Sequence, residues 1–247
     1  MTLFSKAPRP VAVPSRTPLA PLLGLSLLRL GLLLLGLLAA LGTPFAREWR
    51  GWSANLIVVA VDLATLGLVA RLLAREGSSV RTLLGRFRPR DAAVGLLVGV
   101  GLLVALLAST YLANLAVYQG PPPAAPVDPG FRLPLWFGLW CLLVMPVTIA
   151  LAEEVLYRGY LQPRWIGRLG RWPGMLAVAS FFGLQHLAFA LTTPQAAIAR
   201  VLAMVLGGVV FALLYRKIGR LWPLVVGHWF VDVLGLGLPV FLVSLGG

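Results

Sequence analysis

The chain has 247 residues, of which 59% are hydrophobic and only 12% are charged, and its mean hydropathy is +0.90. Soluble globular chains are nearer half apolar and a quarter charged, so this composition excludes an ordinary soluble enzyme and indicates a membrane protein. The formal net charge of +13 does not indicate nucleic acid as a partner. The basic residues lie in short clusters between apolar runs, as in loops that face anionic lipid.

The apolar runs predict an all-α, polytopic membrane helix bundle. Residues 1–19 are basic and rich in proline and are expected to form a disordered tail, and residues 20–247 are expected to form a single transmembrane bundle. A membrane-spanning helix needs about 20 residues. Seven spans are predicted, and the last, with Gly235, Gly237 and Pro239, could break into two helices and give eight. The spans lie at about 20–41, 53–73, 92–118, 135–157, 173–191, 196–215 and 222–245.

Lysine and arginine are distributed unevenly between alternate loops. The tail and the segments 71–90, 158–171 and 216–220 together carry 16 of the 21 basic residues, whereas the opposite loops carry 3 and the spans carry 2. Cytoplasmic loops of membrane proteins are enriched in lysine and arginine. The distribution therefore predicts a multi-pass protein of the inner (plasma) membrane with a cytoplasmic N-terminus.

Eight ionisable residues fall within the predicted spans, where charges are costly and usually functional. Both histidines of the chain are among them, together with a pair of adjacent glutamates. This concentration favours a functional site over isolated structural contacts. The residues are Arg29, Asp62, Glu153, Glu154, His186, Arg200, His228 and Asp232.

The segment LAEEVLYRGY holds two adjacent carboxylates and an arginine. Side chains four residues apart share one face of an α-helix, whereas neighbours point about 100° apart. Glu154 and Arg158 are therefore expected to pair, and Glu153 is expected to point elsewhere, without a local partner. The pattern predicts one glutamate held by an arginine and a second one free for chemistry. The alternative is that both carboxylates only cap the end of a span.

Two further pairs have the same four-residue spacing. Phe182 and His186 share a face in SFFGLQHLAF, and His228 and Asp232 share one in VVGHWFVDVL. An aspartate one turn away from a histidine can fix the tautomer and the orientation of the imidazole ring. On opposite helices these faces would converge with Glu153 in a polar pocket.

The segments EEVLYR, FGLQH and HWFVD resemble, in order, the motifs EExxxR, FxxxH and HxxxN/D. These motifs are typical of CAAX prenyl endopeptidases and bacteriocin-processing enzymes, a family also called CPBP or Abi-type proteases. The resemblance covers about residues 135–240, and the preceding residues carry no motif. Three motifs in order, using both histidines, are a far more specific signal than any one of them alone.

The resemblance implies an intramembrane endopeptidase whose protease core lies at about 135–240. Glu153 and His186 would activate a water for attack on the peptide carbonyl. His228 and Asp232 would stabilise the oxyanion that forms.

The resemblance also implies supporting residues. Glu154 and Arg158 would hold the pocket together, and Phe182 would serve in packing. Asp232 stands where many members of the family have asparagine, so it would have to orient His228 or carry a proton itself.

Two interpretations of the cofactor stay open at this point. Glu153, His186 and His228 form a set that could bind a catalytic zinc and leave one position for water. No HExxH segment is present, and the spacings within the set are long-range. The metal-free glutamate mechanism is preferred, with no cofactor expected, and zinc is the alternative.

Two other functions are compatible with the same residues. An ion-coupled transporter could use intramembrane Glu, His and Asp as a proton relay, although transporters often contain inverted repeats and no repeat is evident in this sequence. A catalytically silent member of the family could act as an immunity or scaffold protein, although the motifs are intact.

The expected partners are the lipid bilayer and a peptide or protein substrate at the membrane. The abundance of Leu, Ala, Arg and Gly suggests a bacterial chain, and protein prenylation is mainly eukaryotic, so only the reaction type is carried over, without the prenylated substrate. Arg29, Asp62 and Arg200 match no motif and are interpreted as polar contacts inside the bundle.

Overall fold

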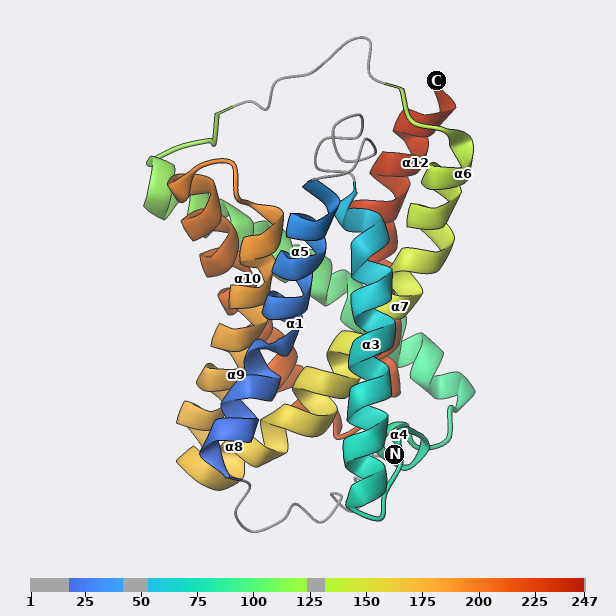
Figure 1. Cartoon of the computed structure of the whole chain (residues 1–247), viewed down its shortest axis with the longest axis vertical. Coiled ribbons are helices and arrows are strands. Elements are labelled where there is room, and N and C mark those ends of the chain that lie inside the picture. Colours follow the sequence, from blue (N-terminus) through green and yellow to red (C-terminus); the bar gives the residue numbers. More distant parts are fainter. Residues whose placement is uncertain (1–17, 42–52, 124–131, 247) are drawn as a thin grey trace.

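The computed structural model describes residues 18–41, 53–123 and 132–246, and within them all regular secondary structure is helical (Figure 1). The predicted all-α class is confirmed. Nearly all of the predicted N-terminal tail lies outside the described residues. In chain order the elements are α1 (Leu19–Leu41), α3 (Ala54–Arg75), α4 (Val80–Leu84), α5 (Pro89–Tyr118), α6 (Leu135–Leu139), η1 (Trp140–Val144), α7 (Met145–Glu153), η2 (Glu154–Leu161), α8 (Gln162–Leu169), α9 (Arg171–Gln185), η3 (His186–Phe189), α10 (Pro194–Ile218), α11 (Trp222–Asp232), η4 (Val233–Gly237) and α12 (Leu238–Leu245).

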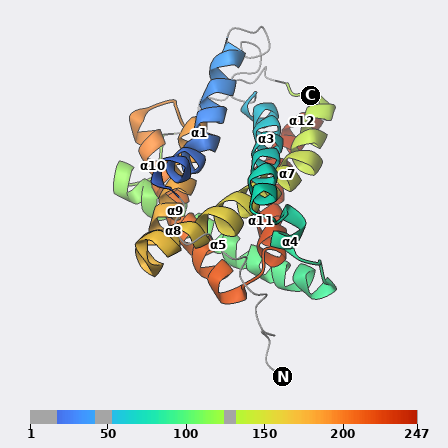
Figure 2. The same cartoon turned by 60° about the horizontal axis from the view of Figure 1, so that its bottom comes forward.

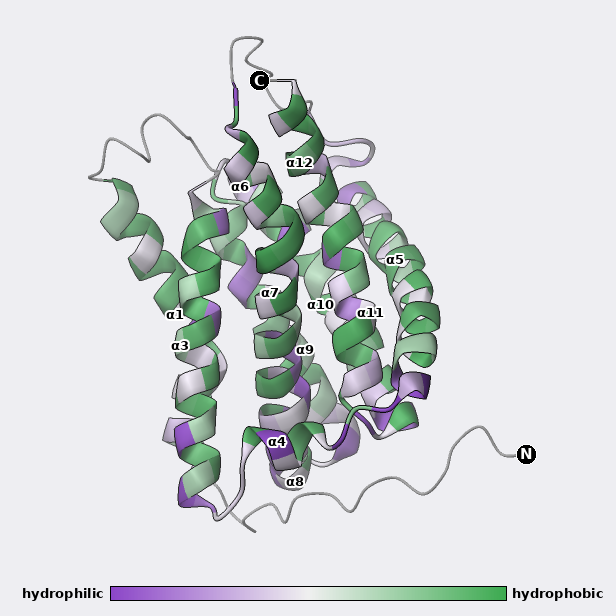
Figure 3. Ribbon diagram, turned by 90° about the vertical axis from the view of Figure 1, so that its right-hand side faces the viewer, coloured by the Kyte–Doolittle hydropathy of each residue, from purple (hydrophilic) through white to green (hydrophobic). Residues whose placement is uncertain are grey.

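Within the described ranges, six helices are long and apolar enough to cross a membrane. They are α1, α3, α5, the continuous helix Leu135–Leu169, α10 and the continuous helix Trp222–Leu245. Figure 3 shows that these helices are hydrophobic along most of their length, while hydrophilic residues gather at the end of the bundle where α4 and α8 lie. The chain is therefore a multi-pass membrane protein.

The predicted span 173–191 differs from the structure. Its α-helix, α9, ends at Gln185 after 15 residues, which is about 22 Å of helix and less than the roughly 30 Å of a hydrocarbon core. The chain continues as the 3-10 turn His186–Phe189, and the hydroxyl of Thr193 then caps the start of α10 by accepting a hydrogen bond from the backbone N–H of Ala196. The motif histidine thus lies at the end of a helix.

Three segments of π-helix interrupt the long helices, and each is followed by a proline in the second position of the next α-helix. Pro146 follows η1, Pro163 follows η2 and Pro239 follows η4. In an α-helix the proline ring clashes with the carbonyl four residues back, and the wider π-helical turn relieves that clash. The last span therefore does not break into two helices at Pro239. It widens instead.

Close approach of α5 and α11 depends on glycines. A Cβ atom added at Gly95 would lie 2.5 Å from Cβ of Val226, and one added at Gly99 would lie 2.8 Å from Cδ1 of Phe230. Small residues of this kind let membrane helices pack with their backbones close together. This packing fixes α11, which carries His228 and the last motif.

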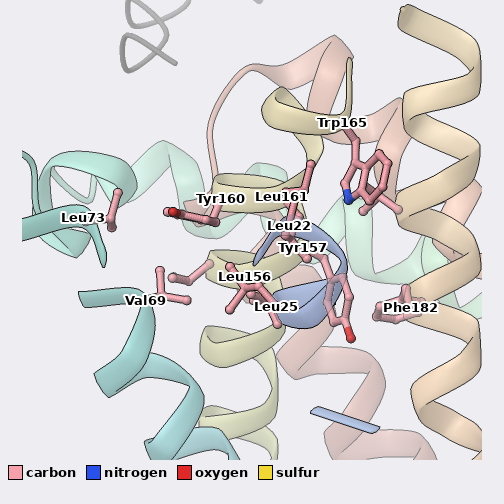
Figure 4. Close-up of a cluster of buried hydrophobic side chains, with 12 residues drawn as sticks. Leu22, Leu25, Val69, Leu73, Leu156, Tyr157, Tyr160, Leu161, Trp165 and Phe182 are labelled. Carbon is pink, nitrogen blue, oxygen red and sulfur yellow. The ribbon is translucent and has the colours of Figure 1, made fainter. Parts of the chain in front are cut away.

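The largest buried cluster joins both halves of the chain (Figure 4). Leu22 and Leu25 of α1 and Val69 of α3 pack in it with Tyr157 of η2 and Phe182 of α9. The rings of Tyr157 and Phe182 meet edge to face, with their centroids 5.4 Å apart. The helices α1 and α3 are therefore held directly against the segments that carry the motifs.

The basic segments meet at one end of the bundle, the lower end in Figure 1, which Figure 2 turns toward the viewer. Arg220 at the start of the last span binds both carboxylate oxygens of Asp91 at 2.9 and 2.6 Å, and it donates to the carbonyl of Arg86. Trp222 donates to the carbonyl of Gly85. These bonds tie together two of the loops whose charges underlie the predicted topology.

Candidate active site

The structure gathers the three motifs from four helical segments. Glu153 ends α7, and Glu154 begins the π-helical segment η2. His186 follows the last residue of α9, and His228 lies within α11. Pro163, downstream of η2, is thus the local sequence feature that favours a wide turn at the EExxxR motif.

His228 lies between the two consecutive glutamates. Its Nδ1 is 2.9 Å from Oε1 of Glu154, and its Nε2 is 3.8 Å from Oε2 of Glu153. Both carboxylates therefore approach one imidazole ring from opposite nitrogens. The expected approach of Glu153 to His228 is thus present, and the two neighbouring glutamates reach the ring from different sides.

Asp232 also approaches His228, one turn along α11. Its Oδ2 lies 3.6 Å from Nε2 of His228, which is an ion-pair distance but not a hydrogen bond. That oxygen is buried and has no hydrogen-bond partner. The carboxylate that holds the ring of His228 is thus Glu154 from another helix. The i, i+4 spacing within α11 had suggested Asp232 instead.

Arg158 pairs with Glu154, as the four-residue spacing predicted. Its Nη1 is 3.4 Å from Oε1 of Glu154, and both side chains are buried. The guanidinium lies between two aromatic rings, 4.2 Å from the centroid of Phe182 and 4.4 Å from that of Phe211. Phe211 on α10 belongs to no motif, and no spacing in the sequence indicated it.

His186 is held by the backbone of its own helix. Its Nδ1 is 2.8 Å from the carbonyl oxygen of Phe182, which can only accept, so Nδ1 carries the proton and Nε2 is left as an acceptor. The ring of Phe182 contacts both imidazoles, with centroids 5.0 Å from His186 and 6.4 Å from His228. The two histidines therefore face the same small region.

Burial differs across the site. Glu153, Glu154, His228 and Asp232 are each at most 6% exposed, whereas His186 is only partly buried. His186 is thus the most exposed of these five residues.

Arg29 of α1 reaches the site from outside the motifs. Its Nη2 donates to Oε1 of Glu153 at 3.0 Å, its Nη1 to Asp62 of α3 at 2.5 Å, and its Nε to Gln185 of α9 at 2.7 Å. The expected lack of a partner close in sequence agrees with this geometry, but Glu153 is held by an arginine 124 residues away along the chain. A sequence signal did exist, since Arg29 and Asp62 are opposite charges within two predicted spans. Arg200, the third such residue, has an exposed side chain on α10.

The zinc set considered from the sequence does not fit the described structure. Among the described residues, no group of three or more His, Cys, Asp and Glu side chains is arranged so that it could hold a metal ion. The bonds to Oε1 of Glu153 and to Nδ1 of each histidine leave Oε2 and the two Nε2 atoms, and these are not gathered into such a group. No catalytic step is therefore assigned to a metal.

Residues 134–234 match the model of a protein family described as Type II CAAX prenyl endopeptidase Rce1-like. The matched region contains all three motifs, and the resemblance inferred from them is confirmed at the level of the family. α1, α3 and α5, and with them Arg29 and Asp62, lie outside the matched region. No curated protein and no solved structure matches the chain.

Proposed function

The chain carries, at residues 134–234, a domain of the Rce1-like family of type II CAAX prenyl endopeptidases, and on that premise we propose that it is an intramembrane endopeptidase. It would hydrolyse peptide bonds of membrane-associated peptides or proteins. The observation that carries the proposal is that His186 and His228, from separate helices, both contact the ring of Phe182 while Glu153 lies 3.8 Å from His228, within a membrane-spanning bundle.

Glu153 is the proposed general base. Its Oε1 is bound by Arg29, which leaves Oε2 to take a proton from a water. His186 would accept the second hydrogen bond of that water through Nε2, because its Nδ1–H is given to the carbonyl of Phe182. Two acceptors then orient the lone pair of the water oxygen toward the carbonyl carbon.

The proposed reaction proceeds by a tetrahedral intermediate. The water oxygen bonds to the carbonyl carbon while one water proton passes to Glu153, and the carbonyl oxygen becomes an oxyanion. The C–N bond then breaks, and the leaving nitrogen takes the proton back from Glu153. The products are a carboxylic acid, which gives up its proton to the released amine, and that amine.

His228 is the proposed donor to the oxyanion. With Nδ1–H engaged by Glu154, donation from Nε2 requires a proton on both nitrogens, and the resulting imidazolium lies among the carboxylates of Glu153, Glu154 and Asp232. Such preorganised donors are worth most in a water-poor site. The proposed mechanism needs no cofactor.

The proposed location is the inner membrane, with the N-terminus in the cytoplasm. It is supported by the basic segments 71–90, 158–171 and 216–220, which lie at one end of the bundle. The proposal does not include a prenyl group on the substrate.

The proposal is tested by comparing cleavage products. The purified protein or its Glu153→Gln variant is reconstituted with membrane proteins extracted from the expression host, and newly formed peptide termini are identified by mass spectrometry. Termini that appear only with the wild type support the proposal. Identical sets of termini would overturn it, provided that both proteins show the same thermal unfolding temperature.

A further inference from the structure

A buried guanidinium links the proposed base to the part of the chain that the family match does not cover. Arg29 is 0% exposed and holds Asp62, Glu153 and Gln185 by one hydrogen bond each. The four residues come from α1, α3, α7 and α9. Arg29 is thus the point at which four separate helices are joined through side-chain atoms.

The geometry fixes which oxygen of Glu153 is available. Oε1 accepts a hydrogen bond from Nη2 of Arg29 at 3.0 Å, whereas Oε2 lies 3.8 Å from Nε2 of His228. A guanidinium is planar, and its donors have fixed directions, so a bond to Oε1 restricts rotation of the carboxylate. Oε2 is therefore held toward the imidazole.

Two neighbours hold the guanidinium itself. Asp62 is 0% exposed and accepts a hydrogen bond from Nη1. Gln185 is 1% exposed, and its side-chain oxygen accepts a hydrogen bond from Nε. Gln185 directly precedes His186, so the guanidinium that orients the proposed base also holds the side chain of the residue next to His186. An unpaired charge at this depth would be costly, and Asp62 supplies the counter-charge.

We infer that Arg29 is a positioning residue for the hydrolytic reaction, with Asp62 as its counter-ion, and that α1 and α3 thereby form part of the active site. This inference rests on the proposed peptidase function. Arg29 and Asp62 lie outside the three motifs. In this inference they fix the orientation of Glu153 relative to the two histidines. The side chains of Arg29 and Asp62 are both 0% exposed.

The first test measures kcat and KM separately on a fluorogenic peptide that carries the sequence cleaved most strongly in the membrane-protein experiment. Arg29→Lys keeps the charge but loses the planar set of donors. We expect kcat to fall about 10- to 100-fold, the range found when a residue that orients a functional side chain is replaced, and we expect KM to stay unchanged. The matched control is Arg164→Lys. Arg164 is also a buried arginine in an ion pair, with Glu76, but it lies at Tyr160, away from Glu153.

The second test separates positioning from simple stability. Arg29→Met leaves two buried carboxylates without their partner and should lower the unfolding temperature, whereas Arg29→Met combined with Asp62→Asn removes one charge of each sign and should regain much of it. We expect kcat of the double variant to stay at least about tenfold below wild type, since Glu153 is still unheld.

The outcomes are distinguishable. A wild type that cleaves no more than Glu153→Gln overturns the peptidase proposal itself. An active wild type with equal kcat for Arg29→Lys and Arg164→Lys overturns the inference alone. Recovery of kcat together with the unfolding temperature in the double variant would likewise show that the pair serves only folding.

Discussion

Nδ1 of His228 and Oε1 of Glu154 lie 2.9 Å apart, and this hydrogen bond joins α11 to the π-helical segment η2. The same oxygen of Glu154 also lies 3.4 Å from Nη1 of Arg158. One carboxylate oxygen therefore connects the structural pair of the first motif to the histidine of the third. Glu154 orients the proposed oxyanion donor as well as the arginine.

Replacement of Glu154 by glutamine removes this charge and keeps the shape of the side chain. We expect kcat to fall by at least about tenfold, because the imidazole loses the anion that holds its tautomer and supports its protonated form. The measurement is kcat on the fluorogenic peptide, with the unfolding temperature taken in parallel. Glu76→Gln, which removes the counter-ion of Arg164, is the control and should retain kcat. A variant with reduced stability and unchanged kcat would contradict the assigned role.

The proposed mechanism is compatible with asparagine in place of Asp232. Its Oδ2 makes no hydrogen bond to His228, and an amide at that position could donate to the oxyanion. We expect Asp232→Asn to keep most of the activity, whereas Asp232→Ala, which removes a carboxylate beside the imidazolium and supplies no donor in its place, should lower kcat by at least about tenfold. Equal loss in both variants would show that the negative charge itself is required.

Phe211 supports the buried arginine through its aromatic face, 4.4 Å from the guanidinium of Arg158. Phe211→Ala is expected to lower the free energy of unfolding by about 3–5 kcal/mol through the cavity it leaves. Phe211→Leu fills most of that volume, and its cost should be roughly 1–2 kcal/mol for the lost cation–π contact and the change of shape. Denaturant titration of the reconstituted protein measures both. No loss in the leucine variant would show that volume alone matters at this position.

Chelation of metal ions should leave the activity unchanged. The described residues contain no group of His, Cys, Asp and Glu side chains arranged to hold a metal ion, and Oε1 of Glu153 is bound by Arg29. The test is kcat before and after dialysis against a strong chelator, followed by addition of zinc. Loss of activity that zinc specifically restores would replace the metal-free mechanism with the zinc alternative.

The sequence indicated much of the architecture. An apolar run long enough to cross a bilayer can satisfy its backbone only as a helix, so the spans follow from composition and length. The pair Glu154–Arg158 also followed from helical spacing and is present. These features depend on residues close in sequence, where local geometry restricts the outcome.

The sequence did not decide how the prolines alter the long helices. Pro163 and Pro239 each follow a π-helical segment, and the first of these segments begins at Glu154. The prolines were visible in the sequence, but a proline can kink, end or widen a helix, and only packing against neighbours selects among these.

The sequence by itself determined that this protein crosses the membrane repeatedly and carries three ordered motifs with both of its histidines. Only the tertiary structure decided the partners of Glu153, because Arg29 lies 124 residues away from it along the chain. Helical periodicity specifies which residues share a face of one helix, but not which faces of different helices meet. That choice is made by close packing, as at Gly95 and Val226, and by the need to pair every buried charge.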